Sequence, residues 1–366
     1  MLTESSVIEA LQPVLDPELN RSVVDLGLVK SVSVNGEMVR VTVAVPAHDY
    51  PRRSELRDRV QAAVAAAPGV GSVAVDLAAM GEDEQKTLAA RLQPLGEGGA
   101  PQNPFLTART RVLAVSSGKG GVGKSSVTTN LSIALAQAGY SVAAVDADVW
   151  GFSMPRMLGI DRPPMLIEKL IVPPSAHGVK LVSMGFFARE DQPVIWRGPM
   201  LHKALEQFLT DVWWDEPQFL VVDMPPGTGD VSLSMAQFLP RAEVIVVTTP
   251  QPAAQKVAQR AAFMAQKVNL TVTGVIENMS WFRGDDGKAY EIFGRGGGQE
   301  LADTLGVPLL GQVPLVPQLR EGGDMGRPIL VENPDDEASR AFTEIARRLY
   351  EDLAPKRVYR SELRIV

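Results

Sequence analysis

The glycine-rich stretch from Ser117 to Ser126 constrains this chain more than any other feature. Within it, residues 118–125 read Gly-Lys-Gly-Gly-Val-Gly-Lys-Ser, which fits the phosphate-loop pattern G-x-x-x-x-G-K-[ST]. An apolar, strand-like run at residues 112–115 precedes the loop, and a segment with helical spacing follows it. The glycines let backbone N–H groups surround phosphate oxygens, and the helix presents its positive N-terminal end to the same anion. The sequence therefore predicts a nucleotide-phosphate site.

Each polar side chain of the loop has an expected role. We expect the Lys124 ammonium group to reach the β- and γ-phosphates of ATP, and the Ser125 hydroxyl to bind Mg²⁺. A glycine turn that fits the pattern by chance is the alternative, and the flanking strand and helix argue against it. The loop residues expected to bind ATP are Gly118, Lys119, Gly120, Gly121, Val122, Gly123, Lys124 and Ser125.

Carboxylates follow two later strand-like runs. Residues 142–145 lead to Asp146-Ala147-Asp148, and residues 219–222 lead to Asp223. Ligand sites in parallel sheets lie at the carboxyl ends of the strands, so these side chains are expected near the phosphate loop. We expect Asp223 to hold the water shell of Mg²⁺ and Asp148 to orient or polarise the attacking water. The alternative for either carboxylate alone is a helix N-cap or a solvated loop.

Strand-like runs and helical segments alternate from Arg109 onward, which is typical of an α/β domain with a mostly parallel sheet. Together with the loop, this pattern predicts a P-loop NTPase domain over residues 109–366. Residues 1–81 predict a small α+β domain in the order α-β-β-α-β, with Asn35-Gly36 as a hairpin turn. Glycine and proline interrupt residues 82–108, which we expect to be a linker.

Composition excludes several classes of function. The chain has 366 residues and no cysteine, so it supplies no disulfide, no thiolate nucleophile and no cysteine-ligated metal site. A net charge of −7 gives no reason to expect nucleic acid or an anionic membrane as a partner. There is no basic, apolar leader at the N-terminus and no run of roughly 18 apolar residues. We therefore expect a cytoplasmic protein.

The small domain contains three motifs: Asp16-Pro17-Glu18-Leu19, Asp25-Leu26-Gly27-Leu28-Val29 and Pro68-Gly69-Val70-Gly71-Ser72-Val73. On these motifs it resembles the small assembly-type domain of iron–sulfur maturation factors, which also occurs fused to ATPases. In that family a cysteine commonly precedes the proline that opens the second helix, whereas Tyr50 precedes Pro51 here. The domain is therefore either a module that handles clusters or partners, or a docking domain without chemistry. The missing thiol favours the docking domain.

The loop also resembles a known class. Its early lysine, Lys119, is similar to that of the deviant Walker A motif in the MinD/ParA/nitrogenase-iron-protein class, where this lysine reaches the nucleotide of the partner subunit. Further segments are similar to the Mrp/ApbC family of ATP-dependent iron–sulfur cluster carriers. The resemblance implies an ATP-sandwiching homodimer with protein clients, catalytic roles for Lys119, Lys124 and Asp148, and an adenine contact by Asn278. The segments similar to that family are residues 146–153, 196–200, 223–230 and 277–280.

The chain departs from that family at the cluster ligands. Cluster-carrying members have a C-x-x-C pair shortly after the Asn-Met-Ser segment, and Gly284 and Gly287 occupy those two positions here. Asp285 and Asp286 offer oxygen ligands to a harder cation, but adjacent aspartates in a glycine turn are usually a solvated loop. The histidines show no ligand spacing; they are His48, His177 and His202.

Three functions remain open. The first is an ATPase of the carrier family that acts in iron–sulfur assembly without the usual cysteine ligands. The second is a MinD/ParA-like positioning or assembly switch with no cluster, which predicts a basic surface or a terminal amphipathic helix. The basic segment at residues 354–360 is short, and Pro355 breaks a helix there. The third is a small-molecule kinase with the same loop, which would need an acceptor pocket.

Overall fold

The structure is a computed structural model that forms two compact units. The smaller unit combines Met1–Leu106 with two later segments, Pro163–Pro174 and Leu209–Asp215. The larger unit comprises Thr107–Arg162, Ser175–Phe208 and Glu216–Val366. The residues that the structure describes are 2–92, 106, 109–148, 151–187, 198–227 and 230–353.

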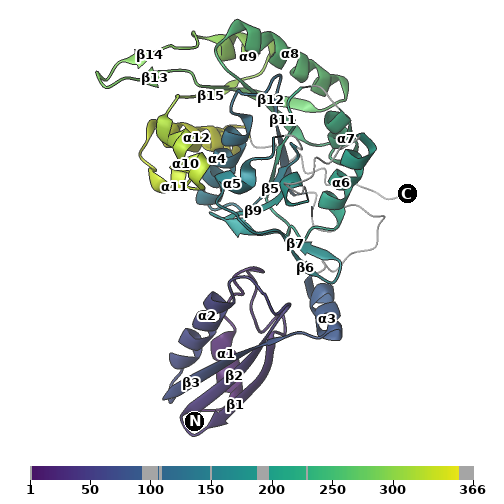
Figure 1. Cartoon of the computed structure of the whole chain (residues 1–366), viewed down its shortest axis with the longest axis vertical. Helices are drawn as coiled ribbons and strands as arrows, with labels where there is room; N and C mark the ends of the chain where they lie inside the picture. Colours follow the sequence, from purple (N-terminus) through teal and green to yellow (C-terminus); the bar gives the residue numbers. More distant parts are fainter. Residues whose placement is uncertain are drawn as a thin grey trace, which may run out of the picture. The chain divides into compact units, whose positions relative to one another are not determined.

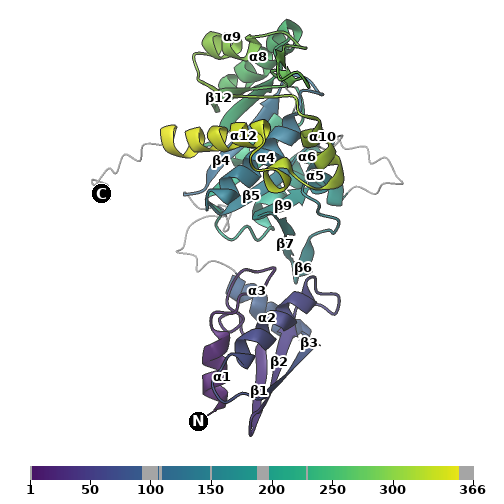
Figure 2. The same ribbon diagram turned by 90° about the vertical axis from the view of Figure 1, so that its left-hand side faces the viewer.

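The smaller unit begins with the predicted α-β-β-α-β order. The helices are α1 (Glu4–Leu11) and α2 (Arg53–Ala65), and the strands are β1 (Val29–Asn35), β2 (Met38–Val45) and β3 (Ser72–Ala79). β2 pairs with β1 in antiparallel and with β3 in parallel orientation. α1 and α2 contact each other and cover one face of this sheet (Figure 2).

Short-range chemistry explains these elements. Thr3 caps α1, because its hydroxyl accepts a hydrogen bond from the Ser6 N–H at 3.2 Å. Gly36 adopts φ +63° in the turn between β1 and β2, a conformation that glycine adopts without strain. Apolar side chains at helical and alternating spacing form the core. Burial of each of these side chains stabilises the fold by about 1.5–3 kcal/mol. They include Val7, Leu11, Val39, Val41, Val43, Leu56, Val60 and Val64.

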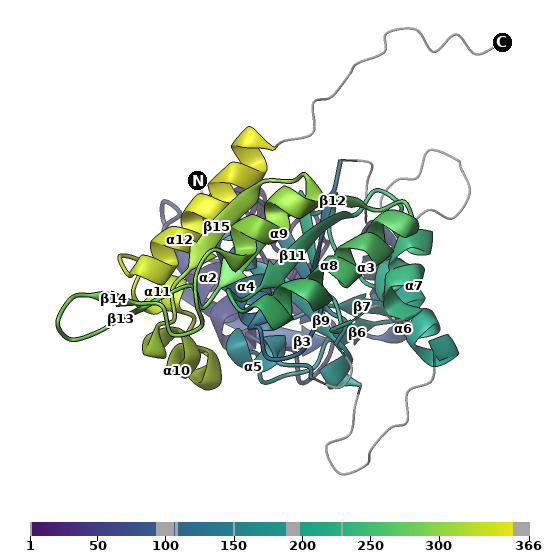
Figure 3. The same ribbon diagram turned by 90° about the horizontal axis from the view of Figure 1, so that it is seen from above.

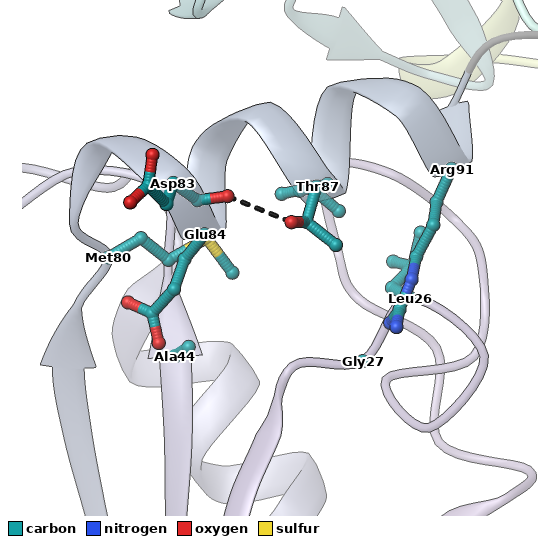
Figure 4. A pocket seen from close by; sticks show the side chains of 9 residues that line it. Leu26, Gly27, Ala44, Met80, Asp83, Glu84, Thr87 and Arg91 are labelled. Carbon is teal, nitrogen blue, oxygen red and sulfur yellow. Dashed lines mark hydrogen bonds between the residues drawn. The ribbon is translucent and has the colours of Figure 1, made fainter.

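The structure differs from the expected linker at its start. Residues Glu82–Leu92 form helix α3, whose buried Leu88 and Leu92 give it an apolar side. Helix α3 borders a cavity of about 230 Å³, in which Arg91 lies against Gly27 (Figure 4). Gly27 adopts φ +68°, a conformation that L side chains rarely adopt, so glycine is favoured there. The remaining linker positions, 93–105 and 107–108, lie outside the described residues.

Two segments that we expected in the NTPase domain belong to the smaller unit. One carries a hairpin of β6 (Met165–Ile167) and β7 (Leu170–Val172). In the other, Asp215 accepts a hydrogen bond from Arg21 at 2.6 Å, and the Arg21 guanidinium lies 5.5 Å from the centre of the Trp213 ring. An ion pair and a cation–π contact between distant residues are invisible to local sequence patterns.

The larger unit is built on an eight-stranded sheet in the order β15-β12-β11-β4-β10-β5-β9-β8 (Figure 1). All neighbouring strands are parallel except β8 and β9. The central strands are buried on both faces, which explains their uninterrupted apolar runs. The strands are β4 (Arg111–Ser117), β5 (Val142–Asp146), β8 (Ser175–Ala176), β9 (Val179–Ser183), β10 (Phe219–Asp223), β11 (Glu243–Thr248), β12 (Thr271–Asn278) and β15 (Leu309–Val313).

Helices cover both faces of this sheet. α4 (Lys124–Gln137) and α12 (Glu337–Arg347) pack on one face, and α8 (Pro252–Lys267) and α9 (Gly297–Leu305) pack on the other (Figure 3). These layers confirm the predicted α/β P-loop fold with a mostly parallel sheet. The other α-helices in the described part of this unit are α5 (Met154–Met157), α6 (Gly198–Thr210), α7 (Asp230–Phe238), α10 (Pro317–Met325) and α11 (Ile329–Glu332).

Two further observations complete the larger unit. A hairpin of β13 (Phe282–Arg283) and β14 (Ala289–Tyr290) follows β12 and projects beyond the sheet (Figure 1). Among the helices that the structure describes, none combines the length and the apolar composition needed to cross a bilayer. The basic segment at residues 354–360 lies outside the described residues.

Candidate nucleotide site

The phosphate loop joins the carboxyl end of β4 to the first residue of α4, Lys124. Gly121 and Gly123 adopt φ +80° and +77°, which other L-residues rarely do. A side chain at Gly118 would lie 2.2 Å from the Val257 carbonyl carbon on α8. These glycines therefore allow the tight turn that places the N–H groups of the loop at the start of α4.

Lys124, Ser125 and Asp223 meet at this edge because β4 and β10 are neighbours in the sheet. The Lys124 Nζ lies 2.7 Å from Asp223 Oδ2, and the Ser125 hydroxyl donates a hydrogen bond to the same oxygen at 2.5 Å. The Thr128 hydroxyl, one helical turn after Lys124, lies 2.7 Å from Asp223 Oδ1 and donates to it. The carboxylate is fully buried, so these partners offset its desolvation.

Asp148 lies on the other side of the lysine. Its Oδ2 is 3.6 Å from Lys124 Nζ, and its Oδ1 accepts a hydrogen bond from the Gly151 N–H at 3.1 Å. The structure therefore brings together Lys124, Ser125, Asp148 and Asp223, as the sequence predicts for a phosphate and Mg²⁺ site.

Asp146 organises the loop that carries Asp148. Its carboxylate accepts hydrogen bonds from the N–H groups of Asp148, Ser153 and Met154 and from the Ser183 hydroxyl, at 3.1–3.2 Å. Burial and the neighbouring charge of Asp223 raise the pKa of Asp146 to about 7.

Lys119 lies apart from this cluster. Its Nζ is 3.5 Å from Gln251 Oε1 at the start of α8, and its carbonyl oxygen accepts a hydrogen bond from the Ser117 hydroxyl. Within the described part of the chain, its ammonium group has no carboxylate partner. The Lys119 ammonium group, half-buried beside the phosphate loop, can therefore pair with an anion that does not belong to this loop.

An apolar cavity of about 210 Å³ adjoins the loop, and Asn278 lies in its wall. The Asn278 Nδ2 donates a hydrogen bond to the Val122 carbonyl oxygen at 2.9 Å. A carbonyl oxygen can only accept, so the amide orientation is defined and the Oδ1 atom is left as an acceptor. Other residues of the wall include Gly123, Met279, Leu315, Val316 and Leu319.

Sequence reasoning missed Thr128 as a member of this site and assigned no role to Asp146. The spacing of Thr128, four residues after Lys124, was a usable signal because such residues share a helix face. Asp146 ends a buried strand, and an acidic residue there also stands out. What the sequence could not show is which groups hydrogen-bond to each carboxylate.

The residues at the family's cluster position do not fit an iron–sulfur cluster. Gly284 and Gly287 lie in the closed turn of the β13–β14 hairpin, where the Gly284 N–H donates to the Lys288 carbonyl oxygen. The Lys288 N–H donates to Asp286 Oδ1 and the Tyr290 hydroxyl donates to Oδ2, and these bonds lower the pKa of Asp286. Within the described ranges no group of three or more histidine, aspartate and glutamate side chains could hold a metal ion, and the chain has no thiolate.

A glycine loop between a parallel strand and a helix, with Lys124, Ser125 and Asp223 at its mouth, defines a P-loop NTPase. Residues 108–350 match the family model of the "NUBPL iron-transfer P-loop NTPase". Residues 4–76 match that of the "Iron-sulfur cluster assembly protein". The chain belongs to the Mrp/ApbC-type family of iron–sulfur cluster carrier P-loop NTPases with this N-terminal domain, and it is a member without cysteine.

Known relatives agree with this assignment. The "Iron-sulfur cluster carrier protein" of Mycobacterium leprae is 44% identical over 352 residues, covering 94% of this chain and 91% of the relative. A nucleotide-binding protein from Archaeoglobus fulgidus, solved with ADP, is 30% identical with a TM-score of 0.55, covering 64% of this chain and 93% of that one. The septum site-determining protein MinD of Pyrococcus horikoshii, solved with Mg-ADP, is 25% identical with a TM-score of 0.51, covering 67% and 98%.

Proposed function

We propose that this protein binds and hydrolyses ATP and acts as a homodimeric switch on protein clients, as a member of the carrier family. The observation that carries the proposal is the convergence of Lys124, Ser125 and Asp223 at the phosphate loop. An ammonium group and two oxygen ligands at the N-terminus of a helix are the groups that ATP and Mg²⁺ require.

In the proposed reaction the N–H groups of residues 118–125 hold the phosphates, and Lys124 balances the charge on the transferred phosphoryl group. Ser125 and Asp223 would hold Mg²⁺, because hydroxyl and carboxylate oxygens are its preferred ligands. When bound, the ion neutralises β- and γ-phosphate oxygens. Asp148, 3.6 Å from Lys124, accepts a hydrogen bond from the attacking water and orients it.

The orientation of Asn278 supports adenine as the base. Because Nδ2 is bonded to the Val122 carbonyl, Oδ1 is the atom that can accept from a base in the adjoining cavity. The exocyclic amino group of adenine donates a hydrogen bond, whereas the corresponding oxygen of guanine only accepts. We therefore propose that the cavity selects ATP over GTP.

Lys119 is the basis for proposing a homodimer. Its ammonium group lies outside the cluster around Asp223, so it can neutralise phosphate charge on the nucleotide of a second copy. The Lys119→Ala variant should bind ATP but lose ATP-dependent dimerisation. Sedimentation velocity measures this loss, with Asp148→Asn present in both compared proteins so that ATP is hydrolysed slowly. A Lys119→Ala protein that still dimerises with ATP would contradict this role.

The decisive experiment for ATP hydrolysis is phosphate release by the purified full-length chain. Lys124→Ala should lose hydrolysis, whereas Asp148→Asn should keep ADP affinity and hydrolyse ATP about 100-fold more slowly. Lys267→Ala, at the exposed end of α8, is the matched control and should behave as the unchanged protein. Unchanged turnover in Lys124→Ala would refute the assignment.

The second candidate is a MinD/ParA-like positioning or assembly switch with no cluster. The absence of cysteine, with glycine at both family ligand positions, favours it. Under the first candidate, the ligands for a cluster must come from a partner, and the domain of residues 1–81 is the proposed docking module for that partner. Anaerobic reconstitution with iron and sulfide tests what both candidates share, namely that the chain alone binds no cluster. Iron at background supports a cluster-free protein, and about four iron per dimer would contradict it.

A further inference from the structure

Glu277 is the second-last residue of β12, and its side chain is fully buried. Among the described residues no lysine, arginine or histidine pairs with it. A buried carboxylate costs free energy unless hydrogen bonds replace its water. Its presence directly before Asn278, at the carboxyl end of a buried strand, therefore needs an explanation.

The Glu277 carboxylate accepts hydrogen bonds from three separate segments. The Ser280 hydroxyl and the Gln312 side-chain amide donate to Oε1 at 2.8 Å and 2.6 Å. The Gly298 N–H, in the first turn of α9, donates to Oε2. A Cβ at Gly298 would lie 2.5 Å from the Glu277 Cβ, so glycine permits this approach. The negative charge is also favourable at the N-terminal end of α9.

The turn that Glu277 holds contains a strained residue. Met279 adopts φ +58°, a left-handed conformation that costs a methionine about 1 kcal/mol or more. Before Met279, the Asn278 side-chain amide donates a hydrogen bond to the Val122 carbonyl of the phosphate loop. After Met279, Ser280 is bonded to Glu277 and to the Val313 carbonyl. The turn is therefore fixed at both ends.

This strained turn forms part of the wall of the apolar cavity beside the phosphate loop, where the base is proposed to bind. Both Asn278 and Met279 line it, together with Leu315, whose N–H donates to the Trp281 carbonyl at 2.7 Å. If the turn relaxed at Met279, the Asn278 oxygen would lose its fixed direction. The β13–β14 hairpin also starts from this turn. Glu277 therefore contacts both ends of the segment that connects β12 to α9, at Ser280 and at Gly298.

We propose that Glu277 is a positioning residue for the nucleotide base: its buried carboxylate holds Met279 in the left-handed conformation and thereby aims Asn278 at the base. This inference rests on the proposed ATP binding and deepens it. Glu277 itself does not touch the nucleotide, and its effect is on base affinity and base selectivity.

A double-mutant cycle tests the proposal, with ADP and GDP binding measured by titration calorimetry on the full-length protein. Glu277→Ala should weaken ADP binding about tenfold and narrow the preference for ADP over GDP, because the turn relaxes. Glycine adopts the left-handed conformation without strain, so Met279→Gly should make the turn independent of Glu277. The double variant should therefore bind ADP within about threefold of Met279→Gly alone.

The controls separate the possible failures. Glu291→Ala, an exposed glutamate of the same connecting segment, should leave ADP affinity unchanged. If the losses in ADP binding free energy of the two single variants add up in the double variant, the positioning role is wrong. If Glu277→Ala does not fold, Glu277→Gln, which keeps an acceptor for Gly298, replaces it in the same cycle. Absence of ADP binding by the unchanged protein would instead refute the proposed function, whatever the cycle shows.

Discussion

Removing the hydroxyl of Thr128 tests whether the buried Asp223 depends on its neighbours for stability. Thr128 is fully buried on α4, and its Oγ1 donates to Asp223 Oδ1 at 2.7 Å. Valine has the same shape and the same branching at Cβ, so Thr128→Val removes the donor with little change in packing. The carboxylate keeps Lys124 and Ser125 on its other oxygen.

The expected cost follows from the type of hydrogen bond. A hydrogen bond to a charged group contributes about 1.5–3 kcal/mol, and the two remaining partners of Asp223 place the loss near 2 kcal/mol. For a unit of this size, that loss lowers Tm by about 4–8 °C. Differential scanning calorimetry of the full-length chain measures it, and ADP with Mg²⁺ identifies the transition of the larger unit by raising its Tm.

The neighbouring threonine is the matched control. Thr129 is equally buried on the same helix, but among the described residues the only hydrogen-bond acceptor for its hydroxyl is the Met157 sulfur, at 3.7 Å. Sulfur is a weak acceptor, so Thr129→Val should lower Tm by less than about 2 °C. Equal losses in the two variants, or no loss in Thr128→Val, would refute the account of how Asp223 is stabilised.

Two further predictions concern other parts of the molecule. Burial raises the pKa of Asp16 above its ordinary value of 3.8, although the Tyr50 hydroxyl and two backbone N–H groups donate to its Oδ1. Its ionisation therefore lowers the stability of the fold as pH rises through the raised pKa. Asp16→Asn keeps the acceptor and removes this titration, so its Tm relative to the unchanged protein should increase between pH 4 and pH 7; a constant difference would contradict the assignment. In the phosphate loop, Gly118→Ala forces the added methyl group against α8 and should lower Tm and weaken ADP binding, whereas Gly120→Ala, where the added atom meets open space, should change Tm much less.

The sequence predicts most of the residues that meet at the candidate site, because they belong to short, local segments. The loop from Gly118 to Ser125 is one continuous segment, and Asp148 and Asp223 each follow a strand that an apolar run reveals. Parallel strands bring their carboxyl ends to one edge, so the convergence of these residues followed from the fold class. The order of the elements in the smaller unit was also predictable, since helical and alternating periods differ.

Other features depended on contacts between distant segments. The sequence predicts a linker at Glu82–Leu92, where the structure has a helix, because glycine and proline are frequent just after it and two buried leucines are a weak signal. The assignment of Pro163–Pro174 and Leu209–Asp215 to the smaller unit rests on long-range contacts, which no local pattern encodes.

By itself, the sequence determined the P-loop, the acidic residues at the ends of the strands beside it, and the absence of any thiolate, because composition and short motifs fix which chemical groups are present. Only the tertiary structure decided which groups meet. Strand order places Asp223 beside Lys124, helix α4 adds Thr128, and the close approach of α9 to β12 surrounds Glu277 with donors. Hydrogen bonds act over about 3 Å, whereas their partners here are far apart along the chain, so only the folded chain can specify them.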